Sequence, residues 1–217
     1  KLDDKIMENN KIFKFQDTPI GKIKHGQSVI MNTKLIESSN RKLGAAFCPV
    51  GTCVYYFNYD KNMESDDKER FYKKDKFGNP LIYNFSIESS GQLDPNEVFS
   101  LGIDTLINKL NDIKKDLVDK NRIKVTFSKS PTIMKAVDLK ISDENDTIGN
   151  LLVKYIQFIK KVDFIAYDII HPLVNDIIIR IAHKENNHDE ISDIFIKTID
   201  YLMDFLNTLK EEWENKN

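Results

Sequence analysis

The stretch Asp143–Ile181, DENDTIGNLLVKYIQFIKKVDFIAYDIIHPLVNDIIIRI, decides the fold. Asp143 or Asp146 can cap a helix, because a short acidic side chain accepts the unpaired amide protons of a first helical turn. The apolar residues that follow recur at steps of three and four and therefore share one helical face. They are Ile148, Leu151, Leu152, Tyr155, Ile156 and Ile159.

The second part of the same stretch predicts two strands joined by a turn. Val162–Tyr167 is short, apolar and bounded by charged residues, which is typical of a strand. His171-Pro172 interrupts it, because proline fixes its own backbone and biases the preceding residue away from helix. Asp176–Ile181 is β-branched on both faces and predicts a largely buried strand.

Two long helices are predicted elsewhere. Asp94-Pro95-Asn96-Glu97 places an acidic cap, a proline at the first helical position and a glutamate three residues after the cap, and the apolar stripe that follows runs to about Val118. The final helix runs from about Asp189 to Trp213 on a single apolar seam. Short strands are predicted for Lys11–Phe15, Ile20–Met31, Cys53–Tyr59, Leu81–Ile87, Arg122–Phe127 and Val137–Ile141.

Strands followed by a long amphipathic helix therefore occur twice, as a repeat of architecture and not of sequence. Each half has a helical seam that it cannot bury alone, so we expect the halves to pack together about a pseudo-twofold axis. The predicted class is α+β, with two halves, 1–122 and 123–217, of antiparallel sheet plus long helices packed as an intrachain pseudo-dimer. The interface would consist of Leu106, Leu110, Ile148, Leu151, Leu152, Tyr155, Ile199, Leu202 and Leu206.

Composition sets the outer bounds. Of the 217 residues, 41% are hydrophobic and 30% are charged, as in a soluble folded protein. The net charge of −2 implies no overall attraction to nucleic acid. No apolar run approaches the roughly 20 residues of a membrane-spanning helix, so we expect no membrane partner. The two cysteines are consistent with a reducing compartment.

Few residues suggest chemistry. Cys48 and Cys53 form a lone C-x4-C, whereas a closed zinc site needs four ligands, so we interpret them as two small, half-buried thiols. His171 is interpreted as a turn residue, and His183 and His188 as solvated. The acidic cluster Asp143, Glu144 and Asp146 does not have EF-hand spacing and is better explained by helix capping. We therefore expect no cofactor, no metal and no catalytic residue.

Three strings within the second half carry a family resemblance. DTIGNLL, followed by VDFIAYDIIHPL and then IIIRI, resembles the small α-like subunit of cellular RNA polymerases, which is the L-type subunit of archaea and the eleventh subunit of RNA polymerase II. The T-x-G-N-L-L turn, the Y-x-x-x-HP-L turn and the strand after them occur in order and at close spacing.

The first half resembles the large α-like subunit, which is the D-type subunit of archaea and the third subunit of RNA polymerase II. Tyr83–Leu110 is similar to its strand and return helix, and the basic loop Arg41–Val50 is similar to its GKEHAKWSPV loop. Gly44, Ala46 and Phe47 replace the His, Lys and Trp of that loop, which puts the partner contacts of the His and Lys in doubt. The family's N-terminal strand and first helix have no counterpart, so we expect either a fragment or a loss of that helix.

The order of a large-type half and then a small-type half resembles the fused α-like subunit of large DNA viruses. The resemblance implies a non-catalytic platform for the largest and second-largest polymerase subunits, with a further small partner like the tenth subunit. DNA would be contacted only through the complex. Outward contacts would come from Arg41, Lys42 and Phe47. The resemblance also implies a location, which is the viral factory and virion if the protein is viral and the nucleus if it is cellular.

Two other functions remain open from the residues alone. One is a stand-alone α+β interaction or regulatory module that uses the same dimerisation fold, and the size of its co-purifying partners would distinguish it. The other is a hydrolase or metalloenzyme, which an activity dependent on His171 or Cys48 would support. The basic loop with Lys34 upstream is either a phosphate or acidic-partner contact or a solvated turn.

Overall fold

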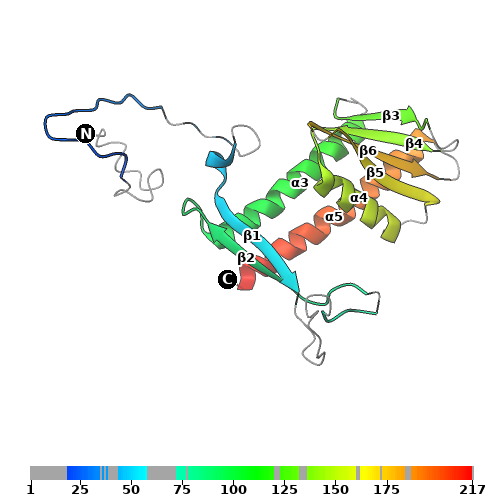
Figure 1. Ribbon diagram of the computed structural model, residues 1–217. Helices are drawn as coiled ribbons and strands as arrows, with labels where there is room; N and C mark the ends of the chain where they lie inside the picture. The colour runs from blue at the N-terminus through cyan, green and yellow to red at the C-terminus, as the bar shows by residue number, and fades with distance from the viewer. Residues whose placement is uncertain are drawn as a thin grey trace. The chain divides into compact units, whose positions relative to one another are not determined.

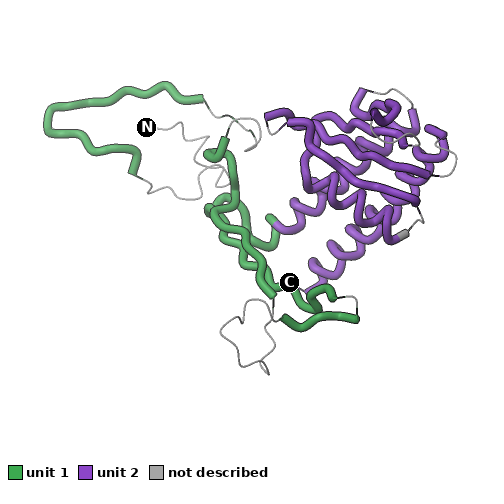
Figure 2. The backbone as a smooth tube through the Cα atoms, turned by 45° about the vertical axis from the view of Figure 1, so that its right-hand side comes forward, with its two compact units in different colours: residues 1–98 green, residues 99–217 purple. Residues whose placement is uncertain are grey.

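The computed structural model describes residues 19–34, 36, 38, 44–57, 72–76, 78–119, 123–131, 136–159, 162–171, 173–183 and 187–216. The chain divides into two compact units, 1–98 and 99–217 (Figure 2). The division at 98/99 reflects spatial compactness and falls inside a helix. The predicted boundary at 122/123 separates two sequence resemblances, so the division does not test it and it stays a prediction. Among the described residues no helix has the length and apolar character needed to cross a membrane.

The elements in chain order are antiparallel strands and long helices (Figure 1). The first unit contains the short 3-10 helix η1, Ala45–Phe47, and the strands β1, Val50–Phe57, and β2, Tyr83–Ser89. Helix α3, Pro95–Asp119, continues into the second unit. The remaining elements are β3 Val125–Lys129, β4 Val137–Ser142, α4 Asp146–Ile159, β5 Phe164–His171, β6 Val174–Ala182 and α5 His188–Lys216. The predicted α+β class with antiparallel sheets is confirmed.

The second unit is built on a four-stranded antiparallel sheet in the order β3-β4-β6-β5. On β4, alternate aliphatic residues stand opposite the isoleucines of β6, as in the pair Leu139 and Ile179. Both of these side chains are fully buried. Burying one such side chain is worth roughly 1.5–3 kcal/mol, so this row is a large part of the driving force for folding.

Helices α3, α4 and α5 complete one hydrophobic core with that sheet. The core residues of α3 are at three- and four-residue steps, among them Leu110, Ile113 and Leu117. The buried stripe of α5 runs from Ile191 to Leu206, as its apolar seam predicts. The two long helices and the β5–β6 hairpin are thus where the sequence pattern places them.

Helix starts confirm one prediction and correct another. At α3, Asp94 Oδ1 accepts the Asn96 N–H at 2.9 Å and Glu97 Oε2 accepts the Asp94 N–H at 3.2 Å, which is the predicted capping box. At α4 the cap is Asn145, whose Oδ1 accepts the Thr147 N–H at 3.2 Å. Capping by Asp143 or Asp146 was wrong, because only the residue immediately before the first turn can reach its free amides.

The β5–β6 hairpin is tighter than predicted. Strand β5 does not stop at Tyr167 but continues to His171, which stands opposite Val174. His171 Nδ1 accepts the Leu173 N–H at 3.1 Å, so the ring stabilises the turn as predicted. Pairing with β6 outweighs the local turn signal, because each added residue gains ladder contacts across the strands.

The strand prediction for Ile20–Met31 was wrong. Residues 19–34 contain no strand, and the Gln27 N–H donates to the Lys24 carbonyl at 3.0 Å in a turn. Ile30 is 92% exposed, so its side chain does not pack on a sheet. The preference of such residues for strands reflects packing on a pleated surface, and the local sequence alone does not provide that surface. The strand predicted at Lys11–Phe15 lies outside the described residues.

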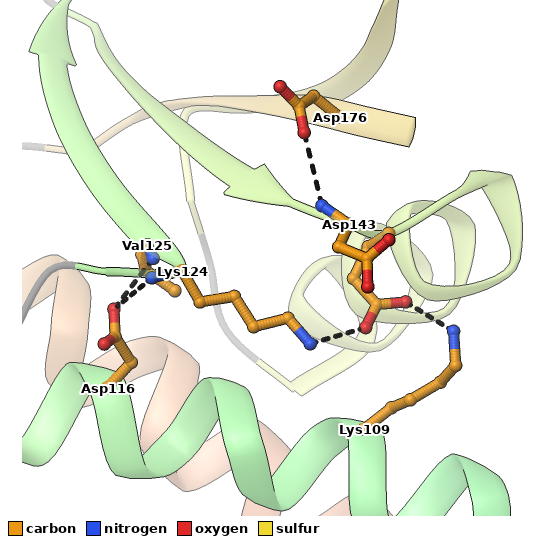
Figure 3. Close-up of polar contacts among 7 residues, drawn as sticks. Lys109, Asp116, Lys124, Val125, Asp143 and Asp176 are labelled. Carbon is orange, nitrogen blue, oxygen red and sulfur yellow. Dashed lines mark hydrogen bonds and ion pairs between the residues drawn. The ribbon is translucent and has the colours of Figure 1, made fainter. Parts of the chain in front are cut away.

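A buried carboxylate ties three elements together. Glu144 is 1% exposed, and its two oxygens accept from Lys109 Nζ of α3 at 2.7 Å and from Lys124 Nζ, just before β3, at 2.8 Å. Figure 3 shows the two lysines reaching this carboxylate from different elements. Glu144 is therefore not part of a helix cap, because its carboxylate pairs with two lysines that are distant in the sequence.

Asp116 adds a second anchor on the same helix. Its carboxylate accepts the backbone N–H groups of Ile123, Lys124 and Val125 at 3.1, 3.2 and 2.7 Å. Figure 3 shows the bonds to Lys124 and Val125. These bonds hold the start of β3 against the last turns of α3. They satisfy backbone donors that would otherwise depend on water.

Gly149 is required where α4 crosses β5. A Cβ at this position would lie 2.7 Å from Cδ2 and 3.0 Å from Cγ of Tyr167. We expect Gly149→Ala to lower the free energy of unfolding by roughly 1–3 kcal/mol, because the ring or the helix must move. Thermal or urea unfolding measures this. Gly102→Ala is the control, since its Cβ meets nothing within 4 Å in α3 and helix propensity predicts equal or higher stability. Equal stability of Gly149→Ala and the wild type would contradict this packing.

Removing the charge of Glu144 should be costly. Glu144→Gln removes the negative charge that pairs with Lys109 and Lys124 and leaves only one acceptor oxygen for the two ammonium groups. We expect a loss of roughly 2–4 kcal/mol, moderated because both lysines keep some solvent contact. Urea unfolding at neutral pH measures it. Asp143→Asn in the same turn is the control, with an expected change within about 0.5 kcal/mol because that side chain is exposed. An unchanged urea midpoint for Glu144→Gln would show that the ion pairs of Glu144 do not stabilise the fold.

Candidate subunit interface

The residues predicted for an interface between halves all lie in the core of the second unit. Six of the nine are buried and belong to α3, α4 and α5: Leu110, Ile148, Leu152, Ile199, Leu202 and Leu206. The other three pack against the same core and are partly buried: Leu106, Leu151 and Tyr155. The structure thus brings all nine together, while their role as an interface between two halves stays a prediction.

Helices α3 and α5 lie against each other through side chains in antiparallel order. Near the start of α3, Phe99 packs on Trp213 with ring centroids 4.3 Å apart. Farther along, Asp104 accepts from Lys210 at 2.7 Å, and Lys114 pairs with Asp200 at 2.5 Å. As positions on α3 advance, their partners on α5 recede, so the helices run in opposite directions.

The two charge pairs on these helices differ from the Glu144 cluster because they are partly solvated. The hydrogen bond that Lys210 donates to the Asp104 carboxylate raises the pKa of Lys210 above its usual value. Exposed pairs of this kind contribute little to stability. They fix the register of α3 against α5, because each charge has its partner at only one alignment.

An exposed apolar surface continues the α4–α5 seam. It consists of Leu151, Tyr155 and Phe158 on α4 and of Tyr201 and Phe205 on α5, and we call it the aromatic face. Tyr155 lies between the others, with centroids 6.0 Å from Tyr201 and 6.4 Å from Phe205. Burial, followed by the neighbouring Tyr201, raises the pKa of Tyr155.

The aromatic face is more exposed than a core extension would be. Phe158 is 81% exposed, Phe205 47% and Tyr201 46%. Aromatic residues grouped on a surface are typical of protein–protein contact sites. Sequence reasoning selected Leu151 and Tyr155 but missed the other three, whose signal was aromatic spacing of three and four beside the seam.

Of the residues predicted for outward contacts, Phe47 is described and is half-buried at the end of η1. Arg41 and Lys42 lie outside the described residues. The turn into η1 contains Gly44 at a φ of 92°, a backbone conformation that suits glycine. The outward role of these three residues stays a prediction.

The candidate chemical residues are spread apart. Cys48 is half-buried and its Sγ donates to the Val50 carbonyl at 3.2 Å. Cys53 is exposed on β1, so its expected half-burial was wrong, because nothing in the described residues covers that strand position. Within the described ranges, no three His, Cys, Asp or Glu side chains are grouped closely enough to hold a metal ion.

The two histidines near α5 are packed rather than solvated, which corrects the prediction. His183 Nε2 lies 3.1 Å from Glu190 Oε1, and both side chains are partly shielded. His188 stacks on Phe127 with centroids 4.9 Å apart. The start of α5 lies against β3 through His188 and Phe127, and a polar sequence could not indicate that contact.

Trp213 is the single tryptophan and reports on the α3–α5 contact. We expect Phe99→Ala to shift Trp213 fluorescence to longer wavelength and to raise its quenching by acrylamide, because the indole loses the ring that covers it. Leu101→Ala is the control, since Leu101 is on the same helix but 48% exposed. Identical spectra for Phe99→Ala and the wild type would mean that the two helices do not meet at this pair.

Comparison with known proteins finds one similarity to a described family. Residues 136–212 match the family model described as the RNA polymerase Rpb3/Rpb11 dimerisation domain. The matched segment contains β4, α4, β5, β6 and most of α5, and hence the whole aromatic face. No curated protein matches the chain. Residues 136–212 are thus similar to a domain through which RNA polymerase subunits dimerise.

Proposed function

We propose that this protein is a non-catalytic assembly subunit of a multisubunit DNA-directed RNA polymerase. The observation that carries the proposal is the match of residues 136–212 to a polymerase dimerisation domain. The α+β fold with antiparallel sheets and long helices is consistent with it. The work of such a subunit is mechanical, because it presents fixed surfaces to other chains.

The finer proposal is that one chain carries both α-like halves. Fusion would raise the effective concentration of one half for the other, so the internal pair would form without an assembly step. The antiparallel contact of α3 with α5 supports this, since the two helices belong to different proposed halves. In a large DNA virus the complex would act in the viral factory and be packaged in the virion, and in a cell it would act in the nucleus.

The largest and second-largest polymerase subunits are the proposed partners, together with a small subunit resembling the tenth. Outward contacts are proposed for Arg41, Lys42 and Phe47. The aromatic face is a further candidate, because it is exposed and lies inside the matched segment. Aromatic side chains contribute strongly at the centres of protein interfaces.

The role of the aromatic face can be tested by replacing two of its exposed aromatic residues with serine, because this leaves the buried core unchanged. We expect Tyr201→Ser with Phe205→Ser to reduce co-purification of the two largest subunits at least tenfold, which corresponds to about 1.4 kcal/mol. Leu173→Ser is the control, because Leu173 is 88% exposed in the β5–β6 turn and apart from the face. Circular dichroism confirms that each variant is folded. If both large subunits co-purify with the double variant at wild-type yield, the aromatic face is not a contact site for them.

Two core substitutions extend the test. Leu151→Asp and Leu202→Asp should both block polymerase assembly, but Leu202 is 1% exposed and its substitution also disrupts the fold. Leu151 is only partly buried, so Leu151→Asp is the more informative of the two. Co-purification of both variants with the large subunits at wild-type yield would contradict the platform.

The alternative is a stand-alone interaction or regulatory module with the same fold. It is favoured by one observation, that the family match covers less than half of the chain. Affinity purification through this chain distinguishes the two. Partners of megadalton scale support the polymerase subunit, whereas small partners alone support the module.

A further inference from the structure

The four-stranded sheet of the second unit has two end strands among the described residues, β3 and β5. An end strand carries a row of backbone N–H and C=O groups that point away from the sheet, and these groups can pair with a strand of another chain. In an antiparallel sheet the outward groups belong to every second residue, because successive residues alternate between facing the partner strand and facing away. The bonds made by these outward groups therefore decide whether a foreign strand can be added.

Strand β5 is the end strand more suited to such pairing by length and composition. It has eight residues, Phe164–His171, whereas β3 has five. Its sequence, FIAYDIIH, is mostly β-branched and aromatic and contains one acidic residue, Asp168. Segments of this kind, with high strand propensity and low charge, pair readily with other chains. Phe164 is 42% exposed and Ile170 49%, so two of its large apolar side chains are accessible.

Asp168 blocks the outward side of β5 near its middle. Its Oδ1 accepts the Ile169 N–H at 2.9 Å, so this amide is bonded within the strand itself. An amide that is donated to a neighbouring side chain is not donated to β6, which identifies Ile169 as an outward residue. Asp168 is exposed, and its carboxylate places a negative charge beside the edge where an incoming strand would lie.

Two further features blunt the same edge. Ile165, four residues before Ile169 and so with the same backbone orientation, accepts from Gln157 Nε2 of α4 at 3.4 Å through its carbonyl oxygen. The register of β5 against β6 shifts between Ile169 and His171, an irregularity that interrupts regular pairing. A single outward residue, Tyr167, lies between the two bonded positions. An incoming strand would therefore have to displace a side chain before it could form consecutive ladder bonds.

Strand β3 is closed in a similar way at its start. The Lys124 carbonyl faces β4, because it accepts the Ser142 N–H at 2.9 Å. The next residue, Val125, faces outward, and its N–H is donated to Asp116 of α3 at 2.7 Å. In both end strands an outward amide is thus bonded to an aspartate, which comes from the strand itself in β5 and from a helix in β3.

We infer that these side chains close the sheet to strand addition, with Asp168 as the principal cap of β5. The alternative is that Asp168 only makes the surface polar, in which case its position on the strand would not matter. A cap is specific to its position, because the acceptor must reach the Ile169 amide. Other chains would then contact this sheet through side chains and not by β-augmentation. This inference does not depend on the polymerase assignment.

The cap is tested by residue-resolved amide hydrogen exchange of the full-length chain, measured by NMR. The protection factor is the exchange rate in the unfolded chain divided by the rate in the folded chain. We expect Asp168→Val to lower the protection factor of the Ile169 amide at least tenfold. Asp168→Asn keeps a side-chain oxygen and should change it less than threefold. The Tyr167 amide is the internal reference and should change less than threefold in both variants.

The closed edge is tested by offering it a strand. The probe is a fluorescein-labelled peptide of alternating threonine and valine, as long as β5, and fluorescence anisotropy measures its binding to the full-length chain. We expect Asp168→Val to bind the peptide at least tenfold more tightly than the wild type. Asp112→Val is the matched control, because it makes the same replacement at an exposed position of helix α3, and it should change binding less than twofold.

Arg180 interacts electrostatically with Asp168 but keeps its two 2.7 Å bonds to Asp138, so the replacement leaves no buried charge without a partner. Circular dichroism checks that each variant is folded. Tighter peptide binding by Asp168→Val, together with added protection of the Tyr167 amide, would place the peptide on the β5 edge and support the inference.

Three results would overturn the inference. The first is an unprotected Ile169 amide in the wild type, or the same protection in the wild type and Asp168→Val. The second is equal peptide binding by the wild type and Asp168→Val, or tighter binding that leaves Tyr167 exchange unchanged. The third is an equal gain in binding from Asp112→Val, because the effect would then follow from added surface hydrophobicity.

Discussion

The apolar seam of α5 is the constraint on which the second unit depends. Ile191, Phe195, Ile199, Leu202 and Leu206 are buried along one side of this helix, and their cover comes from the sheet and from α3 and α4. A 29-residue helix of low mean hydropathy has no reason to persist alone in water, so its stability comes from that packing. The same contact sets the antiparallel alignment of α3 and leaves the aromatic face at its margin.

Sequence patterns predicted an element well where the residues that determine it are close together in the sequence. The Asp94–Glu97 capping box, the seam of α5 and the alternation of β4 each depend on residues within one or two turns or strands, and all three are found. The strand expected at Ile20–Met31 failed because a strand also needs a partner, which a local pattern does not contain.

Long-range polar contacts and exposed surfaces were the parts that the sequence could not supply. Glu144 looked like a capping residue, since its lysine partners are distant in sequence and only the fold brings them to it. The nine interface candidates were found by periodicity, which identifies apolar faces but not which of them stay uncovered. For that reason the exposed side chains of Tyr201 and Phe205 were identified only from the structure.

The central claim is that this chain works by holding other polymerase subunits together. Native mass spectrometry of the complex isolated through a tag on this chain tests it most directly. The account predicts an assembly with one copy of the chain and both largest RNA polymerase subunits. Recovery of the chain alone, or only in self-associated form, under conditions in which the polymerase stays intact would contradict it.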